Sequence, residues 1–224
     1  MKPVVLYDLC TADDRRLSPY CRRIRLALAH KGLPVETVPT PFTAIPRIAG
    51  GGQKTVPVID DGGRLVRDSW AIAEYLEEAY PDRPSLFGGP AGQSAARFVE
   101  AWANALLPQI SPIVLTDIHA LLAPEDQAYF RASREARFGR SLEAVCADRE
   151  ARIPAFREAL LPLRLMLRSQ PFIGGAGPTY ADYAVCGTLH WPLTVSSLEL
   201  LAPDDPVRIW YAACEEACGL GAGR

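Results

Sequence analysis

The sequence is poor in the residues that metal and nucleic-acid sites need. It has only three histidines, and its 24 lysines and arginines are matched by 26 acidic residues. The basic residues are dispersed among acidic ones, so we expect no nucleic-acid partner. The cysteines lack the paired spacing of a zinc site, and we expect no metal. These absences leave small-molecule chemistry as the function to look for.

Long hydrophobic runs are also scarce. We expect no apolar stretch long enough to cross a bilayer and therefore no membrane association. The segment Met1-Lys2-Pro3 lacks the apolar core of a signal peptide, which predicts a cytoplasmic protein with six reduced cysteines. An apolar content of 49% and a formal net charge of -2 are typical of a globular chain, whose length suits two domains.

Turn-forming residues divide the chain. Proline and glycine cluster at residues 81–84 and 88–90, and strand signals vanish after them. We therefore predict a first domain of residues 1–82 and a second, all-helical domain of residues 91–224. Its helices are expected over residues 91–120, 125–140, 153–169, 179–196 and 206–218. Pro108 and Pro112 should break or kink the first of them.

A short motif, Ser18-Pro19-Tyr20-Cys21, joins a predicted strand at residues 4–7 to a helix that ends near residue 31. Serine is a favoured N-cap, and proline fits the first helical position because its missing N–H would have no partner there. A thiolate beside Ser18 would meet free N–H groups, the helix dipole and a hydroxyl, all of which lower a thiol pKa. Plain helix capping explains the same residues, so the motif needs support from the rest of the domain.

That support comes from two later segments. Residues 55–59 and 64–66 flank a glycine turn and predict a β-hairpin, after a strand expected at residues 35–38 and an irregular segment through residue 46. Pro57 cannot donate to a strand ladder, which leaves the backbone of Val56 free to pair with a peptide-like ligand. Asp68-Ser69 then opens a helix over residues 70–80, and the N-terminus of that helix is a second anion site.

In this order the first domain resembles the thioredoxin-like domain of glutathione S-transferases. The motifs that carry the resemblance are Ser18-Pro19-Tyr20, Val56-Pro57 and Asp68-Ser69, with Phe172-Ile173-Gly174-Gly175 and Pro178-Thr179-Tyr180-Ala181-Asp182 in the second domain. The resemblance spans nearly the whole chain and implies an α+β protein, with an N-terminal thioredoxin-like βαβ-ββα domain followed by an all-α helical bundle domain. Phe42-Thr43, residues 68–76 and Ser133-Arg134-Glu135 also resemble the bacterial β-etherase-like branch, whose members cleave lignin-derived aryl ethers.

The resemblance implies that glutathione is the co-substrate. Pro57 would be cis, the backbone of Val56 would pair with the cysteinyl part, and Asp68-Ser69 would hold the γ-glutamyl end. We expect the glycine end near Gln53 or Lys54. Ser18 would donate a hydrogen bond to the thiolate, which attacks an apolar, aromatic electrophile. The resemblance also implies a homodimer.

The electrophile pocket should form where the helical domain faces Ser18. Large apolar side chains at helical spacing are candidates for it, although they are also typical of a core. The candidates are Trp102, Leu106, Ile110, Ile113, Phe138, His190 and Trp191.

Two other functions remain open at this point. Cys10 or Cys21 would serve a glutathione-dependent thiol reductase, since Ser18-x-x-Cys21 resembles a redox motif that has lost its first cysteine. A non-catalytic ligand carrier of the same fold is the third possibility. Two features are read as structural: Thr179-x-x-Asp182 as a capping box and the arginines around the first helix as a solvated face.

Overall fold

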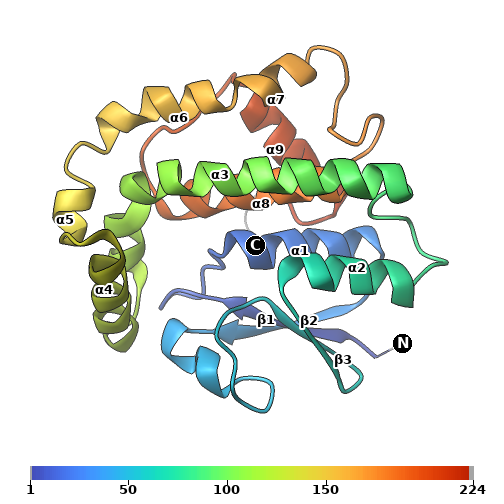
Figure 1. Ribbon diagram of the computed structural model, residues 1–224, viewed down its shortest axis with the longest axis horizontal. Coiled ribbons are helices and arrows are strands. Elements are labelled where there is room, and N and C mark those ends of the chain that lie inside the picture. The colour runs from blue at the N-terminus through green and yellow to red at the C-terminus, as the bar shows by residue number, and fades with distance from the viewer. Residues whose placement is uncertain (1, 222–224) are drawn as a thin grey trace.

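The computed structural model describes residues 2–221. A four-stranded mixed sheet forms its first part, in the order β2-β1-β3-β4. The strands are β1 (Val4–Leu9), β2 (Val35–Thr40), β3 (Val58–Asp61) and β4 (Arg64–Arg67). β1 pairs with β2 in parallel and with β3 antiparallel. The helices α1 (Pro19–His30) and α2 (Ser69–Ala79) lie between this sheet and the helical part of the chain (Figure 1).

Two local features of the first part bear on the ligand site. The peptide bond Val56-Pro57 is cis, as the resemblance implied. β3 starts at Val58, three residues later than predicted, because Pro57 has no N–H to donate to a ladder. The segment expected to be irregular contains a short 3₁₀ helix, η1 (Phe42–Arg47).

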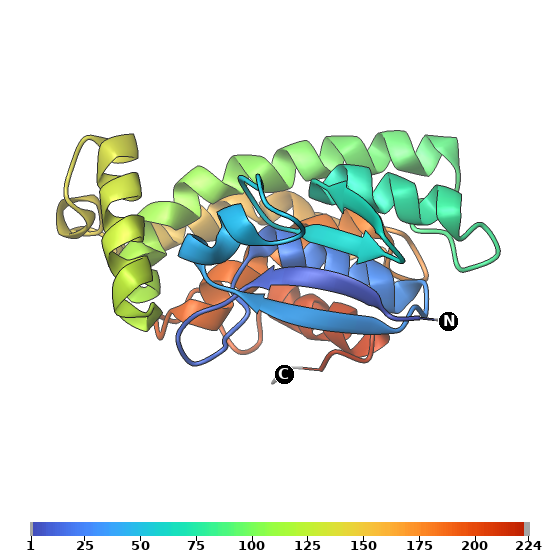
Figure 2. The ribbon, with the colours of Figure 1, turned by 90° about the horizontal axis from the view of Figure 1, so that it is seen from below.

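The rest of the chain is helical, as predicted. Its elements are α3 (Pro90–Leu121), α4 (Pro124–Phe138), α5 (Leu142–Val145), η2 (Glu150–Arg152), α6 (Ile153–Ala159), α7 (Leu161–Met166), α8 (Tyr180–Val195) and α9 (Pro206–Ala217). α3 and α8 run side by side above α1. Figure 2 views the sheet from below, with α4 standing at one end of the molecule. The exact division at residues 82 and 91 stays a prediction.

Prolines shape the helices in two ways. α3 passes through Pro108 and Pro112 without a break, and its ribbon bends toward α4 near its C-terminal end (Figure 1). The predicted helix over residues 153–169 is wrong, because it is divided at Leu160 into α6 and α7. Pro162 lacks the N–H that would continue the ladder of α6. The short α5 was not predicted from the sequence.

The expectation about membrane spans also needs correction. By length and composition, one helix of the described residues, α3, is apolar enough to cross a bilayer. In this fold α3 packs along α8, and Glu100 on α3 forms ion pairs with Arg23 and Arg97. A long helix at the core of a globular protein meets the same criterion, so the finding carries no membrane assignment.

α8 is the central helix, and it is buried on nearly all sides. Gly187 allows it to approach the first turn of α1. A Cβ atom at this position would clash with the carbonyl oxygen of Pro19 and lie 2.7 Å from Cγ of Arg23. The absence of a side chain therefore sets how closely α8 supports the start of α1.

The arginines of α1 are not a solvated face, contrary to the sequence prediction. Arg22 is 5% exposed and its Nε donates to Glu215 of α9 at 2.9 Å. Arg23 is fully buried and donates to Asn104 of α3 and Thr188 of α8, both at 2.9 Å. Polar groups of α3, α8 and α9, with Glu100 and Glu215 as the acidic partners, compensate the buried charges of Arg23 and Arg22.

Asp182 has the structural role predicted for it. The carboxylate is fully buried and accepts hydrogen bonds from the backbone N–H groups of Ile173, Gly174 and Thr179 and from the indole of Trp210. It thereby caps α8 and ties the preceding loop to α9.

Candidate functional site

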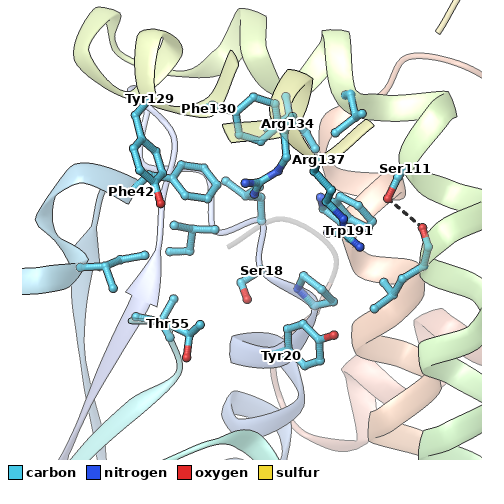
Figure 3. A pocket seen from close by; sticks show the side chains of 18 of the residues that line it. Ser18, Tyr20, Phe42, Thr55, Ser111, Tyr129, Phe130, Arg134, Arg137 and Trp191 are labelled. Atoms are coloured by element: carbon cyan, nitrogen blue, oxygen red, sulfur yellow. Dashed lines mark hydrogen bonds between the residues drawn. The ribbon is translucent and has the colours of Figure 1, made fainter. Parts of the chain in front are cut away.

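A cavity of about 330 Å³ lies between the first domain and the helical part (Figure 3). The first domain contributes Leu9, Leu17, Ser18, Pro19, Tyr20, Phe42, Ile45, Lys54, Thr55 and Val56. The helices contribute Leu107, Ser111, Leu115, Ile118, Tyr129, Phe130, Arg134, Arg137, Phe138 and Trp191. The wall is largely apolar and aromatic, with a few polar groups, which is the usual character of a small-molecule site.

Ser18 lies at the N-terminus of α1 and lines this cavity. Its Oγ accepts the backbone N–H of Cys21 at 3.2 Å, so the predicted N-cap is confirmed. An oxygen that accepts in this way keeps its own O–H to donate. The side chain therefore presents a hydroxyl at the positive end of a helix dipole, where an anion is stabilised.

The nearby thiols are poor candidates for reactive groups. Cys21 is fully buried, and burial together with the charge of Asp8 raises its pKa well above the ordinary value. Burial also raises the pKa of Cys10 to about 11. Both thiols therefore remain protonated at neutral pH, whereas the reactive form of cysteine is the thiolate.

The segment before β3 forms another part of the wall. Lys54, Thr55 and Val56 line the cavity immediately before the cis bond to Pro57. Gln53 is buried, and its Oε1 accepts a hydrogen bond from Nε of Arg67 at 2.6 Å. The structure thus brings Ser18 and Val56 to the wall of one cavity.

Asp68 and Ser69 lie at the start of α2 and do not line this cavity. Asp68 caps the helix, since its Oδ1 accepts the N–H groups of Trp70 and Ala71 at 2.9 and 3.1 Å. Its backbone has a φ of 72°, a strained conformation for a residue other than glycine. Ser69 is buried, and its carbonyl accepts the hydroxyl of Tyr180 at 3.1 Å. A strained cap at a helix N-terminus is typical of a ligand site.

Comparison with known proteins assigns both parts of the chain. Residues 14–84 match the N-terminal domain of glutathione S-transferases, and residues 94–200 match the C-terminal domain of the same family. The chain belongs to the glutathione S-transferase family. The thioredoxin-like first domain and the all-helical second domain are thereby confirmed.

Individual relatives support the assignment. A probable glutathione S-transferase, GSTU6 of Oryza sativa subsp. japonica, is 28% identical over 85% of this chain and 75% of its own. The crystal structure of glutathione transferase GSTFuA3 from Phanerochaete chrysosporium is 25% identical, with a TM-score of 0.85 over 97% of this chain and 98% of that one. A glutathione S-transferase of Ceriporiopsis subvermispora, crystallised in complex with glutathione, is 26% identical, with a TM-score of 0.80 over 96% and 98% of the two chains.

The predicted pocket residues of this transferase fall into two groups: those that line the cavity and those that lie in the core. Phe138 and Trp191 line the cavity, whereas Trp102 and Ile110 do not. Ile110 is fully buried in the hydrophobic core, and Trp102 packs against that core. The residues of α3 that line the cavity are Leu107, Ser111, Leu115 and Ile118. Helical spacing predicted an apolar stripe on α3, but it did not show which stripe turns toward Ser18.

The other three candidates from the helical domain are also core residues. Leu106 and Ile113 are each 1% exposed and belong to the hydrophobic core. His190 is buried, and its ring nitrogens lie 2.7 Å from the carbonyl oxygen of Arg16 and 2.8 Å from the hydroxyl of Tyr211. Burial lowers the pKa of His190 to about 3, so the ring is neutral and joins α8 to neighbouring segments.

Sequence reasoning missed several residues of this transferase's cavity. Tyr129, Phe130, Arg134 and Arg137 line it from α4, and Phe42 lines it from η1. Phe130, Arg134 and Arg137 follow one another at spacings of four and three, which places them on one face of a helix. That spacing was visible in the sequence, but two arginines on a helix resemble an ordinary solvated surface.

Proposed function

We propose that this transferase binds glutathione beside Pro57 and uses Ser18 to keep the thiol ionised. The observation that carries the proposal is the position of Ser18, an N-cap hydroxyl on the wall of an aromatic cavity. The sulfur of glutathione would meet the hydroxyl, the free N–H groups and the dipole of α1 together. The protein supplies position and ionisation, while glutathione supplies the nucleophile.

The rest of the tripeptide can be assigned to the remaining predicted residues. The backbone of Val56 pairs with the cysteinyl part. Asp68 and Ser69 hold the γ-glutamyl end, where Oδ2 of Asp68 can accept from the ligand's ammonium group because Oδ1 already serves the helix cap. The glycine carboxylate lies near Gln53 or Lys54. The ammonium group of Lys54 carries the opposite charge and can pair with this carboxylate.

The chemistry is a nucleophilic substitution or addition. The thiolate attacks an electrophilic carbon of an apolar, aromatic substrate, and a carbon–sulfur bond forms while the leaving group departs with the bonding electrons. With an activated alkene the electron pair moves onto the neighbouring carbon, which takes a proton from water. β-Aryl ethers are candidate substrates because of the resemblance to the β-etherase-like branch.

The size of the Ser18 effect can be estimated. A hydrogen bond to a charged group contributes about 1.5–3 kcal/mol. At about 1.4 kcal/mol per pKa unit, one such bond acidifies the bound thiol by roughly one to two units. A thiol with an ordinary pKa of about 8.5 would then be substantially ionised at neutral pH.

Ser18→Ala tests this role directly. We expect the pKa of bound glutathione to rise by about one to two units, with little change in KM for glutathione. The measurement is the ultraviolet absorbance of the thiolate as a function of pH, together with the pH profile of kcat/KM. Ser111→Ala is the matched control, since Ser111 lines the same cavity but its hydroxyl donates to the carbonyl of Leu107 at 2.9 Å. An unchanged thiol pKa in Ser18→Ala would refute the proposal.

The reductase alternative predicts a different pattern. Cys10→Ser or Cys21→Ser would abolish activity, and a mixed disulfide with glutathione would appear in the intact mass. The raised pKa values of both thiols oppose this alternative. A carrier, the third possibility, would bind aromatic ligands without consuming glutathione in the presence of aryl halides, β-aryl ethers or activated alkenes.

We also propose a homodimer. Phe98 on α3 is 78% exposed, and Leu65 on the edge strand β4 is also exposed. The resemblance to the family implies the dimer, and its interface would cover such exposed apolar side chains. A monomeric mass in sedimentation equilibrium at micromolar concentration would contradict this part of the proposal.

A further inference from the structure

The cavity beside Ser18 carries positive charge that no acidic side chain of its wall balances. Lys54, Arg134 and Arg137 line it, and its described wall contains no aspartate or glutamate. A cation that is partly removed from water is stabilised by an anion beside it. The positive charge of the wall therefore favours a ligand that carries a negative charge.

Arg134 is the most informative of these cations. It extends from α4 toward the space above Ser18 (Figure 3), and its guanidinium lies 4.6 Å from the ring centroid of Phe130 and 5.6 Å from that of Phe42. The side chain is half-buried, and burial together with the charge of Arg137 lowers its pKa. The aromatic rings hold the guanidinium in place by cation–π contact.

Most donors of Arg134 have no protein acceptor in the described part of the chain. Its hydrogen bond there goes from Nη1 to the hydroxyl of Ser133 at 2.9 Å. A guanidinium group has five N–H donors in a planar fork, which matches the two oxygens of a carboxylate. Donors that face a cavity and lack a partner are available to a ligand.

Arg131 on the same helix differs from Arg134 in that acidic side chains compensate its charge. It donates to Glu135 at 2.9 Å and to Glu143 at 2.8 and 3.1 Å, so two carboxylates neutralise its charge. Arg134 follows three residues later and faces the cavity, and among residues 2–221 no carboxylate forms an ion pair with it. The helix thus carries a compensated arginine outside the cavity and an uncompensated one inside it.

We propose that the electrophile of this site is an aromatic carboxylate whose carboxylate group pairs with Arg134. The inference rests on the proposed function, because it takes the sulfur of glutathione to lie at Ser18. The ring of the substrate would pack among Phe42, Phe130 and Trp191, with the reacting carbon turned toward Ser18. Arg137 is exposed at the same wall and adds a longer-range attraction for the anion.

Two substrates that differ only in the charge of one group test whether the carboxylate pairs with Arg134. In 4-chloro-3-nitrobenzoate the thiolate attacks the ring carbon that bears chlorine, the carbon–sulfur bond forms, and chloride leaves with the bonding electrons. The thiol proton goes to water, and the carboxylate takes no part in the reaction. 4-Chloro-3-nitrobenzamide undergoes the same substitution without the charge, and each rate is divided by its uncatalysed rate.

Arg134→Gln should separate the two substrates. We expect kcat/KM for the benzoate to fall by about 10- to 100-fold, as for the loss of a hydrogen-bonded charge, while kcat/KM for the benzamide changes little. Arg134→Lys keeps the charge without the planar fork and should restore part of the loss. Arg131→Gln is the matched control on the same helix, and thermal melting of all three variants shows whether they are folded.

Two results would overturn the inference. Equal losses of kcat/KM for the benzoate and the benzamide in Arg134→Gln would mean that Arg134 does not bind the carboxylate of the electrophile. A rise in KM for glutathione with both electrophiles would assign the arginine to a carboxylate of glutathione.

Calorimetric binding of the benzoate to the protein without glutathione tests the inference separately from turnover. Binding that weakens about tenfold in Arg134→Gln supports the inference even if the protein conjugates neither compound, in which case only the proposed function fails. The inference fails if the wild-type protein does not bind the benzoate, or if the two proteins bind it equally.

Discussion

The two walls of the cavity are built in opposite ways. Ser18 stands on α1, which is backed by α8, a helix that is buried on nearly all sides. The opposite wall is α4, on which Asp126 and Phe130 are the buried residues. The wall that carries Ser18 is therefore held by tight packing, whereas the wall that carries Arg134 has many half-exposed side chains. A half-exposed wall tolerates substitution with little loss of stability, so under the proposed function the electrophile side could vary while the position of Ser18 stays fixed.

The largest effect that we expect on the buried wall comes from Arg22→Met. Glu215 is 1% exposed and would lose the guanidinium that compensates its charge. Removing one partner of a buried ion pair destabilises a protein by about 3–5 kcal/mol, and urea unfolding measures the loss. The double variant Arg22→Met/Glu215→Leu should recover much of it, since no unpaired charge remains. A single-variant loss under about 1 kcal/mol would mean that this wall is not held by the pair.

Gly187→Ala should have a smaller effect on the same wall. The new Cβ atom would press against the carbonyl oxygen of Pro19, and this strain should lower the free energy of unfolding by about 1–3 kcal/mol. The displaced first turn of α1 carries Ser18, so kcat/KM should fall as well. Gly177→Ala is the matched control, because its Cβ would meet no atom within 4 Å. Identical unfolding midpoints for the two variants would show that the close approach of α8 is dispensable.

The smallest effect should come from the opposite wall. In Arg131→Gln the exposed ion pairs with Glu135 and Glu143 are lost. Solvent screens such pairs, so we expect no measurable change in the urea midpoint and no change in the ratio of benzoate to benzamide turnover. A destabilisation as large as that of Arg22→Met would remove the contrast between the two walls.

The local features of the site could be predicted from the sequence because they depend on neighbouring residues. The N-cap at Ser18, the turn between β3 and β4 and the cap at Asp68 follow from a few consecutive side chains. The predictions that were wrong concern features that depend on contacts between residues far apart in the sequence. Ile110 is in the core while Ser111 faces the cavity, and only the packing of α3 against α8 distinguishes the two.

The sequence by itself determined the order of strands and helices in the first domain, the family and the hydroxyl at the start of α1, because periodicity, caps and turns act over short segments. The tertiary structure decided which charges are buried and which face the cavity. Arg22 and Arg134 are chemically identical in the sequence, yet one compensates Glu215 in the interior and the other faces a cavity whose wall, in the described part of the chain, contains no acidic residue. The free energy of a charge depends on what surrounds it in space, and those surroundings come from segments far away in the chain.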